Sequence, residues 1–355
     1  MKAAICHEFG KPLVVEEVDI DSPQTGEVKV KISATAICHS DMHATQGELG
    51  PFLPLLAGHE SSGYVEEIGE GVTSVKVGDP VVVSLLIACG RCRQCVAGNP
   101  HLCENKWTQE KRVHTKDGKD VSLMARVGSF AEYVIVDQSQ VVVIPKDMPI
   151  HQAALLACGV ITGFGAVVNR AQVEPLSSVV VIGTGGVGLN SIQGADYAGA
   201  YPVIAVDMLD SKLKASKSFG ATHTVKASDE DAVKQVQDLT SGGADYVFIT
   251  VGISSAVEQG FAMSGTRGTT VIVGLAGGQM SLPPMAFIRP ERAVMGSFMG
   301  TTRLSVDVPK LVTLYQNGGL KLDELITKRY PLDEINEAIS AVERGEALRN
   351  LIVFD

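Results

Sequence analysis

The chain has 355 residues, of which 45% are hydrophobic and 20% charged, so it is long enough for two packed domains and too apolar to be disordered. Its formal net charge of -10, without any block of like charges, disfavours binding to nucleic acid or to an anionic membrane surface. The N-terminus lacks the apolar core of a signal peptide, and no apolar run is long enough to span a membrane, so we expect a cytoplasmic protein.

The first third of the chain consists of short apolar stretches separated by turn residues. The segment "EVKVKISATAI" alternates through Val28, Val30 and Ile32, which is typical of a strand with one buried face. The stretch "SGYVEEIGEGVTSVKVGDPVVV" mixes β-branched residues with glycines, as strands joined by turns do. These patterns predict an all-β, loop-rich domain. The polar segment 106–127 is expected to be a long surface loop near the pocket or a subunit contact.

From Ser178 onward, short apolar strands alternate with helical segments. The six expected strands lie in "SSVVVIG", "VIAVD", "THTV", "DYVFITVG", "TTVIVG" and "RAVMGSF". Strands joined by helices predict a parallel, doubly wound Rossmann sheet with helices on both faces, so the fold class is α/β plus β. After Phe298 two helical segments and the strand "LRNLIVF" follow, which we expect to return to the first domain because six strands complete a Rossmann sheet. The predicted domains are 1–160 with 299–355, and 161–298.

A glycine-rich turn follows the first of these strands. Gly183, Gly185 and Gly188 form G-x-G-x-x-G between a strand and a helix, where the backbone can approach a pyrophosphate and the helix N-terminus can bind it. Asp207 closes the next strand, where a carboxylate binds the adenosine ribose and repels a 2′-phosphate, so we expect NAD rather than NADP. Lys212 either touches that ribose or is a solvated helix lysine. The alternative for the whole motif is a glycine-rich turn that binds no nucleotide.

Four of the seven cysteines lie in the short stretch "CGRCRQCVAGNPHLC", at Cys89, Cys92, Cys95 and Cys103. Clustered cysteines in a reducing compartment favour metal binding over disulfides. Four thiolates in one loop can surround a tetrahedral ion and leave no position open, so a structural zinc is expected, with an iron–sulfur cluster as the alternative. Since a closed site cannot activate a substrate, the chemistry must lie elsewhere.

Cys38, His59 and Cys158 offer a second set of metal ligands. Two thiolates and one imidazole suit zinc and leave a fourth position for water or substrate, and an open zinc is a Lewis acid that can act on an alcohol oxygen. These residues are far apart in the sequence, and a lone His or Cys is more often a core residue. Spacing alone therefore does not decide between an open metal site and three separate core residues. Cys6 lies outside every motif and is expected to be a buried, small apolar residue.

In their order along the chain, the motifs "CHSDMH", "GHE", "CGRCRQCVAGNPHLC", "ACGVITG" and "GTGGVG" resemble those of the zinc-dependent medium-chain alcohol dehydrogenases. The resemblance covers nearly the whole chain. It implies a GroES-like catalytic domain with two zinc sites, an inserted Rossmann coenzyme domain, and NAD-linked oxidation of an alcohol. It also implies a homodimer or homotetramer, because "TTVIVGLAGGQM" and "AVMGSF" resemble the strands by which relatives dimerise.

The resemblance assigns the metal ligands by motif position. Cys38, His59 and Cys158 resemble the catalytic zinc ligands, and the four clustered cysteines resemble the structural ones. Glu60 is similar to a glutamate that enters the coordination sphere transiently. Asp41 is similar to the carboxylate that orients the histidine ligand, which fixes the tautomer and the angle of the ring.

The resemblance also implies a proton relay and cofactor contacts. Ser40 and His43 are similar to a relay in which the serine hydroxyl takes the alcohol proton, the cofactor ribose passes it on and the histidine releases it to solvent. Cofactor contacts beyond the glycine-rich turn are implied for Thr162 and Val187 at the nicotinamide, for Arg349 at the pyrophosphate, and for His39, where many relatives have an arginine.

The same motifs narrow the substrate. Related polyol dehydrogenases typically have a glutamate where this chain has Cys158, which disfavours a sugar alcohol. Formaldehyde dehydrogenases that act on thiol adducts usually have an arginine in the region where this chain has Trp107, which disfavours that substrate. Leu85 lies where relatives line the pocket with a bulky side chain, so an aliphatic or aromatic alcohol is expected. The alternatives are a thiol-adduct formaldehyde dehydrogenase, a zinc-free reductase, and an NAD-binding module without catalysis.

Overall fold

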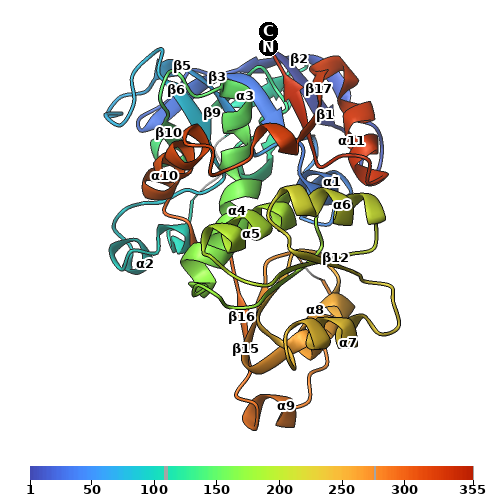
Figure 1. The fold of residues 1–355 in the computed structure, drawn as a ribbon. Helices are drawn as coiled ribbons and strands as arrows, with labels where there is room; N and C mark the ends of the chain where they lie inside the picture. Colours follow the sequence, from blue (N-terminus) through green and yellow to red (C-terminus); the bar gives the residue numbers. More distant parts are fainter. Residues whose placement is uncertain (108–110, 276, 355) are drawn as a thin grey trace. The chain divides into compact units, whose positions relative to one another are not determined.

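The structure is a computed structural model that describes residues 1–107, 111–275 and 277–354 (Figure 1). Two compact units make up the chain, one of Met1–Cys158 with Arg303–Asp355 and the other of Gly159–Thr302. All seven cysteines lie in the first unit, and the glycine-rich turn lies in the second.

One sheet of the first unit runs in the strand order β7-β2-β1-β4-β8. Strand β1 lies at its centre, and its residues from Ala3 to Cys6 are fully buried in the core beneath the sheet. The prediction for Cys6 is therefore confirmed, and burial raises the pKa of its thiol. The strands are β1 (Lys2–Cys6), β2 (Val14–Ile20), β4 (Leu55–Leu56), β7 (Val113–Thr115) and β8 (Ser122–Leu123).

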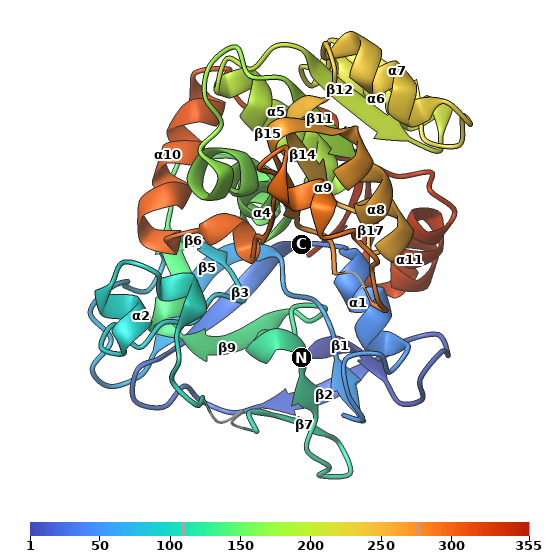
Figure 2. The same ribbon diagram turned by 90° about the horizontal axis from the view of Figure 1, so that it is seen from below.

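The other sheet of the first unit runs in the order β10-β6-β5-β3-β18-β17, and β9 also pairs with β3. Val28, Val30 and Ile32 of β3 are buried as their alternation predicts, whereas Lys31 between them is exposed. Figure 2 shows β3, β5 and β6 side by side in blue. The strands are β3 (Glu27–Ala36), β5 (Ser61–Ile68), β6 (Pro80–Val83), β9 (Tyr133–Asp137), β10 (Val141–Val143), β17 (Ile326–Pro331) and β18 (Arg349–Val353).

Short helices fill the connections of the first unit. In α11, Ile335, Ala338 and Val342 recur at helical spacing and pack on the core beneath β1. The α-helices are α1 (His39–Thr45), α2 (Arg93–Val96), α3 (Ile150–Ala154), α10 (Leu304–Gln316) and α11 (Ile335–Glu343). The 3-10 helices are η1 (Pro100–Leu102), η2 (Met124–Arg126), η3 (Gln138–Gln140), η4 (Leu155–Ala157), η7 (Asp323–Leu325) and η8 (Leu332–Glu334).

The second unit is a parallel sheet in the order β13-β12-β11-β14-β15-β16, which confirms the predicted doubly wound Rossmann fold. The four residues of β11 are all buried, as expected for a central strand that is covered on both faces. The strands are β11 (Val179–Ile182), β12 (Val203–Asp207), β13 (His223–Lys226), β14 (Ala244–Ile249), β15 (Ser264–Ile272) and β16 (Ala293–Gly296).

Helices connect the strands of this sheet. Ala232 and Val236 of α7 and Val257 of α8 pack in one core with Val180 and Ile182 of β11, so these two helices cover one face. The helices are α4 (Gly159–Gly165), the π-helix η5 (Ala166–Ala171), α5 (Gly186–Tyr197), α6 (Asp210–Ser218), α7 (Ala232–Leu239), α8 (Ser254–Met263), α9 (Met285–Ile288) and η6 (Met299–Thr301). Within the described residues no single helix is long and apolar enough to cross a membrane. The bent pair of helices at Ile150–Ala157 and Gly159–Ala171 reaches that length and apolar content only when both helices are counted together.

The predicted surface loop at 106–127 is wrong in part, although Lys116 and its neighbours up to Asp120 are exposed as expected. Residues 108–110 lie outside the described residues, but from Val113 onward the chain forms β7, which pairs with β2, and β8, which pairs with β4. Val113, Val121, Leu123 and Met124 are buried in the core beneath β1. Burial of these apolar residues outweighs the many charges that gave the segment its polar composition.

Candidate metal and nucleotide sites

The register of two strands brings Cys38 and His59 together. Strands β3 and β5 pair antiparallel with Thr35 opposite Ser61, so the residues that follow β3 lie beside those that precede β5. Cys38 follows β3, directly before α1, and His59 and Glu60 directly precede β5. The two motifs "CHSDMH" and "GHE" therefore meet at one end of the sheet.

Cys158 reaches the same place after α3 and η4. The Ser62 hydroxyl donates to the Ile150 carbonyl at 2.5 Å, and the Ser84 hydroxyl donates to the Ala157 carbonyl at 2.6 Å. These bonds tie the segment before Cys158 to β5 and to the end of β6. The potential ligand atoms of Cys38, His59, Glu60 and Cys158 all lie within 4.8 Å of one another.

A buried carboxylate orients the histidine of this cluster. Asp41 and His59 are 0% and 1% exposed, and His59 Nδ1–H donates to Asp41 at 2.9 Å. Asp41 also accepts the backbone N–H groups of Gly58 at 3.0 Å and Cys38 at 2.9 Å. Since Nδ1 donates to Asp41, Nε2 is the ring nitrogen of His59 that is left to bind a metal.

The protons of the cluster are held unevenly by its residues, and a metal ion would displace those on the Cys158 thiol and on Nε2 of His59. The hydrogen bond from the Cys158 thiol, together with the adjacent His59 ring, holds the pKa of Cys38 well below its usual range despite burial. That same bond and burial raise the pKa of Cys158 well above its usual value. Burial lowers the pKa of His59, but the Asp41 carboxylate and Cys38 outweigh it and raise this pKa well above normal. Two sulfurs and one imidazole form the donor set that zinc prefers.

Glu60 has a partner that the sequence did not predict. Arg349, at the start of β18, forms a short ion pair with the Glu60 carboxylate, and both side chains are buried. Burial raises the pKa of Glu60 to about 7, against the lowering effect of the Arg349 guanidinium. The pairing depends on β18 lying next to β3, which a local motif does not reveal. The role of Arg349 at a pyrophosphate stays a prediction.

Helix α1 carries the three other polar residues of its motif. Ser40 Oγ lies 3.1 Å from Cys38 Sγ. His43 Nδ1 lies 2.5 Å from Glu48 Oε2, a contact that we did not predict. His39, the first residue of the helix, is exposed. Ser40 therefore lies beside a cluster residue, while His43 reaches toward solvent.

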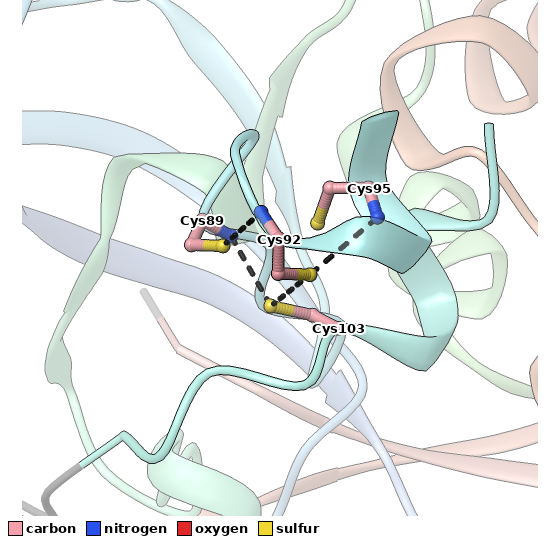
Figure 3. A group of neighbouring side chains, drawn as sticks. All are labelled: Cys89, Cys92, Cys95 and Cys103. Carbon is pink, nitrogen blue, oxygen red and sulfur yellow. Dashed lines mark hydrogen bonds between the residues drawn. The ribbon is translucent and has the colours of Figure 1, made fainter. Parts of the chain in front are cut away.

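The other cysteine cluster is formed by one loop around α2 and η1, and Figure 3 shows its sulfurs turned toward one another. The sulfurs of Cys89, Cys92, Cys95 and Cys103 lie within 4.8 Å of one another. Backbone N–H groups of Cys95 at 3.5 Å and Glu104 at 3.4 Å donate to Cys92 Sγ and lower the pKa of Cys92 to about 6. Four converging sulfurs with such N–H donors fit a tetrahedral zinc.

The glycine-rich turn of the second unit has three glycines with three different constraints. Gly183 has a φ of +86°, and a Cβ there would lie 2.4 Å from Val251. A Cβ at Gly188 would lie 1.8 Å from the Gly183 carbonyl oxygen, so this glycine lets α5 approach the strand. A Cβ at Gly185 would meet nothing within 4 Å, which leaves open space where a pyrophosphate can approach the N-terminus of α5. The turn therefore fits a dinucleotide.

Asp207, the last residue of β12, lies against this turn. Its Oδ2 accepts the backbone N–H of Thr184 at 2.7 Å and the Thr184 hydroxyl at 3.0 Å, and its Oδ1 accepts the N–H of Leu209 at 3.0 Å. The contact with Thr184 was not predicted, although Thr184 is the residue between the first two glycines of the motif. It fixes the carboxylate at the end of the strand, beside the glycine-rich turn.

The remaining predicted cofactor residues of the second unit lie on three helices. Thr162 is on α4, and its hydroxyl donates to Met299 Sδ at 3.5 Å. Val187 is on α5, which packs so tightly on α4 that a Cβ at Gly163 would lie 2.1 Å from the Val187 carbonyl oxygen. Lys212 is on α6 and is partly exposed. Thr162 and Val187 are thus on neighbouring helices, and the roles of all three stay predictions.

Two family models match most of the chain. Residues 24–146 match the one described as "Alcohol dehydrogenase GroES-like domain", and residues 186–317 match "Zinc-binding dehydrogenase". The NDMA-dependent alcohol dehydrogenase of Amycolatopsis methanolica is 39% identical over 99% of this chain and 98% of its own length. The S-(hydroxymethyl)glutathione dehydrogenase of Saccharomyces cerevisiae is 35% identical over 99% of this chain and 96% of its own length.

A solved structure is similar over the same length. Benzyl alcohol dehydrogenase from Acinetobacter calcoaceticus has a TM-score of 0.93 and 33% identity, and the match covers 100% of this chain and 99% of that one. The chain belongs to the zinc-dependent medium-chain alcohol dehydrogenase family. The family predicted from the motifs, a family of oxidoreductases with a GroES-like domain and a Rossmann domain, is therefore confirmed.

Proposed function

We propose that this protein is a zinc-dependent, NAD-linked alcohol dehydrogenase that interconverts aliphatic or aromatic alcohols and their aldehydes or ketones. The observation that carries the proposal is the convergence of Cys38, His59 and Cys158 on one point of the first unit. In this proposal residues 1–160 and 299–355 form the catalytic domain, and residues 161–298 form the coenzyme domain.

Cys38, His59 and Cys158 would hold the catalytic zinc, which when bound supplies a Lewis acid for the alcohol oxygen. Three protein ligands leave a fourth position for the substrate. Glu60 belongs to the same cluster, but Arg349 holds its carboxylate, so we assign Glu60 a transient role as a ligand. Asp41 holds the His59 ring in the tautomer that leaves Nε2 for the metal.

The protein's own residues would move the proton. The Ser40 hydroxyl, beside Cys38, accepts the proton of the alcohol, and His43 releases it to water. A partly exposed His43 supports this role, because the last group of a relay must reach solvent.

The four clustered cysteines, Cys89, Cys92, Cys95 and Cys103, would hold a structural zinc. Their four sulfurs, which lie within 4.8 Å of one another, would be enough to complete a tetrahedral coordination shell and would leave this ion no position for a substrate. Its role is to stabilise the loop around α2 and η1.

NAD would be the hydride acceptor, held by the glycine-rich turn. Open space beside Gly185 supports close approach of the pyrophosphate, and Asp207 supports NAD over NADP because a carboxylate repels a 2′-phosphate. We assign further cofactor contacts to His39, Thr162, Val187, Lys212 and Arg349.

Two substrate classes remain to be separated by experiment. Similarity to benzyl alcohol dehydrogenase of Acinetobacter calcoaceticus supports an aromatic alcohol. Similarity to S-(hydroxymethyl)glutathione dehydrogenase of Saccharomyces cerevisiae supports a thiol adduct of formaldehyde as the second candidate. The NDMA-dependent relative makes NDMA an electron acceptor worth testing beside NAD.

We also propose that the protein is a homodimer or homotetramer in the cytoplasm. Strand β16 ends the parallel sheet, and the neighbouring Met285 and Ile288 are each 67% exposed, which supports a further subunit at this edge. The seven cysteines form no disulfide, which supports a reducing compartment. Light scattering after gel filtration distinguishes a monomer from these oligomers.

The deciding experiment is the Cys38→Ser variant, assayed with primary, secondary, aromatic and thiol-adduct alcohols and with NAD, NADP or NDMA as acceptor. Loss of the zinc ligand is expected to lower kcat/KM for oxidation by about 1000-fold, because a bound metal contributes several kcal/mol to such reactions. NAD affinity, measured by calorimetry, is expected to stay within about threefold of the wild type, since the glycine-rich turn belongs to the other unit.

Cys6→Ser is the matched control, because Cys6 is a buried cysteine outside both clusters whose Sγ already contacts the carbonyl oxygens of Glu8 and Thr45. It is expected to keep wild-type activity. Full activity of Cys38→Ser refutes the catalytic site, and NAD binding by the wild type without turnover of any alcohol favours the module without catalysis.

A further inference from the structure

The end of helix α1 brings Glu48 back onto His43. The helix ends at Thr45, and Gly47 has a φ of +84°, a left-handed conformation that favours glycine. The backbone N–H of Gly47 donates to the Ala44 carbonyl at 3.1 Å, and that of Glu48 donates to the His43 carbonyl at 3.0 Å. Together these bonds form a Schellman motif, which fixes Glu48 beside His43 whatever their side chains are.

The side chains of these two residues are also joined. His43 Nδ1–H donates to Glu48 Oε2 at 2.5 Å, a hydrogen bond to a charged acceptor. A carboxylate only accepts, so the proton of the neutral ring is on Nδ1 and Nε2 keeps its lone pair. The two side chains are 41% and 55% exposed, so water reaches the pair.

We propose that Glu48 is a positioning residue for the proton relay. It holds His43 in the Nδ1–H tautomer, so that Nε2 accepts the proton released during alcohol oxidation, and its charge stabilises the ring while that proton is bound. The inference rests on the proposed function, in which His43 is the outer group of the relay. In this step the O–H bond of the relay hydroxyl that precedes His43 breaks and an N–H bond forms at Nε2. Water then removes this proton from the ring, and no oxidation state changes.

The chain contains a matched control for this pair. His7 Nε2 and Glu16 Oε1 lie 3.1 Å apart, and these side chains are 42% and 30% exposed. Glu16→Gln therefore breaks a similar histidine–glutamate contact that lies outside the motif of α1. Any effect of Glu48→Gln that Glu16→Gln lacks is specific to the relay.

The first test is the steady-state rate of alcohol oxidation. Glu48→Gln is expected to lower kcat about threefold and to leave KM unchanged, since a half-exposed charged pair contributes only a small effect. Glu48→Asp, which keeps the charge, is expected to recover most of this loss. In a His43→Gln background, Glu48→Gln is expected to cause no further loss, because Glu48 acts only through the ring.

The second test does not depend on activity. Nitrogen NMR of histidine-labelled protein reports which ring nitrogen of His43 carries the proton, and the His43→Gln variant identifies its signals. We expect the Nδ1–H tautomer in the wild type and in Glu16→Gln, and a shift toward Nε2–H in Glu48→Gln. Zinc content and NAD affinity are expected to stay the same in all of these variants.

Failure of the inference differs from failure of the proposed function. Wild-type kcat in Glu48→Gln overturns the inference, whether or not the tautomer changes, and leaves the alcohol dehydrogenase standing. An equal loss of kcat in the His43→Gln background overturns it as well, because Glu48 then acts by another route. A wild-type protein that oxidises no alcohol overturns the proposed function and removes the relay with it.

Discussion

The two cysteine clusters of the first unit differ in how they are assembled. One cluster lies in a single loop that begins at Cys89, ends at Cys103 and holds all four sulfurs. Backbone N–H groups of this loop donate hydrogen bonds to those sulfurs. The other cluster takes Cys38, His59 and Cys158 from three distant segments. Its orienting group is a buried carboxylate instead of the local backbone.

This difference fits the two roles that we propose for the clusters. A closed site needs only four ligands around one ion, and a short loop provides them. An open site must hold three ligands rigidly while a fourth position stays available, so it depends on strand register and on residues that orient the ligands. We call the four cysteines the loop cluster, and Cys38, His59 and Cys158 the dispersed cluster. Loss of a ligand is thus expected to lower the stability of the protein at the loop cluster and its activity at the dispersed cluster.

The largest effect is expected from Cys103→Ser, which removes one ligand of the loop cluster. The protein should lose one of the two zinc ions that we propose, and its melting temperature should fall by about 10 °C, since the binding energy of a structural zinc is folding energy. Metal analysis and thermal unfolding check this result. Arg93→Ser, an exposed change in the same loop, is the control and should alter neither measurement.

Arg349→Met is expected to have the next largest effect, because it leaves the buried Glu60 carboxylate without its ion pair. The free energy of unfolding, measured with urea, should fall by about 3 kcal/mol. Adding Glu60→Gln should recover part of this loss, because the buried charge is then gone as well. Zinc at the loop cluster should be unchanged. Wild-type stability of Arg349→Met would show that the pair does not stabilise the dispersed cluster.

Asp41→Asn should produce the smallest of these effects, confined to the dispersed cluster. The amide binds the His59 ring more weakly and leaves its tautomer less defined, so zinc affinity at this site should fall about 10-fold to 100-fold. Competition with a chelator measures this affinity. The four-cysteine site in the same protein is the internal control, and equal weakening of both sites would contradict the prediction.

Local sequence patterns predicted the features that depend only on residues close together in the sequence. The six strands of the Rossmann sheet, the burial of Val28, Val30 and Ile32, and the close spacing of the loop cysteines all follow from residues near one another in the sequence. The same reasoning failed in part for the predicted loop at 106–127, where apolar residues scattered among charges form two short strands. Their partners, β2 and β4, lie elsewhere in the chain, so composition alone did not reveal them.

Most of the contacts that were missed join residues far apart in the sequence. Glu60 pairs with Arg349 because β18 adds to β3, and Thr184 binds Asp207 because β12 lies next to β11. The contact between His43 and Glu48 spans only a few residues, and Gly47 was the signal for it, since a glycine after a helix predicts the turn that joins them.

By itself, the sequence determined the family and the presence of a GroES-like and a Rossmann domain, because motifs and hydrophobic periods are local properties of a chain. Spacing left open whether Cys38, His59 and Cys158 meet, and the tertiary structure brings them together as the resemblance implied. Only the tertiary structure decided which cation holds Glu60. The physical reason is that a coordination shell and a buried ion pair require distances of a few ångströms between groups that the chain alone leaves far apart.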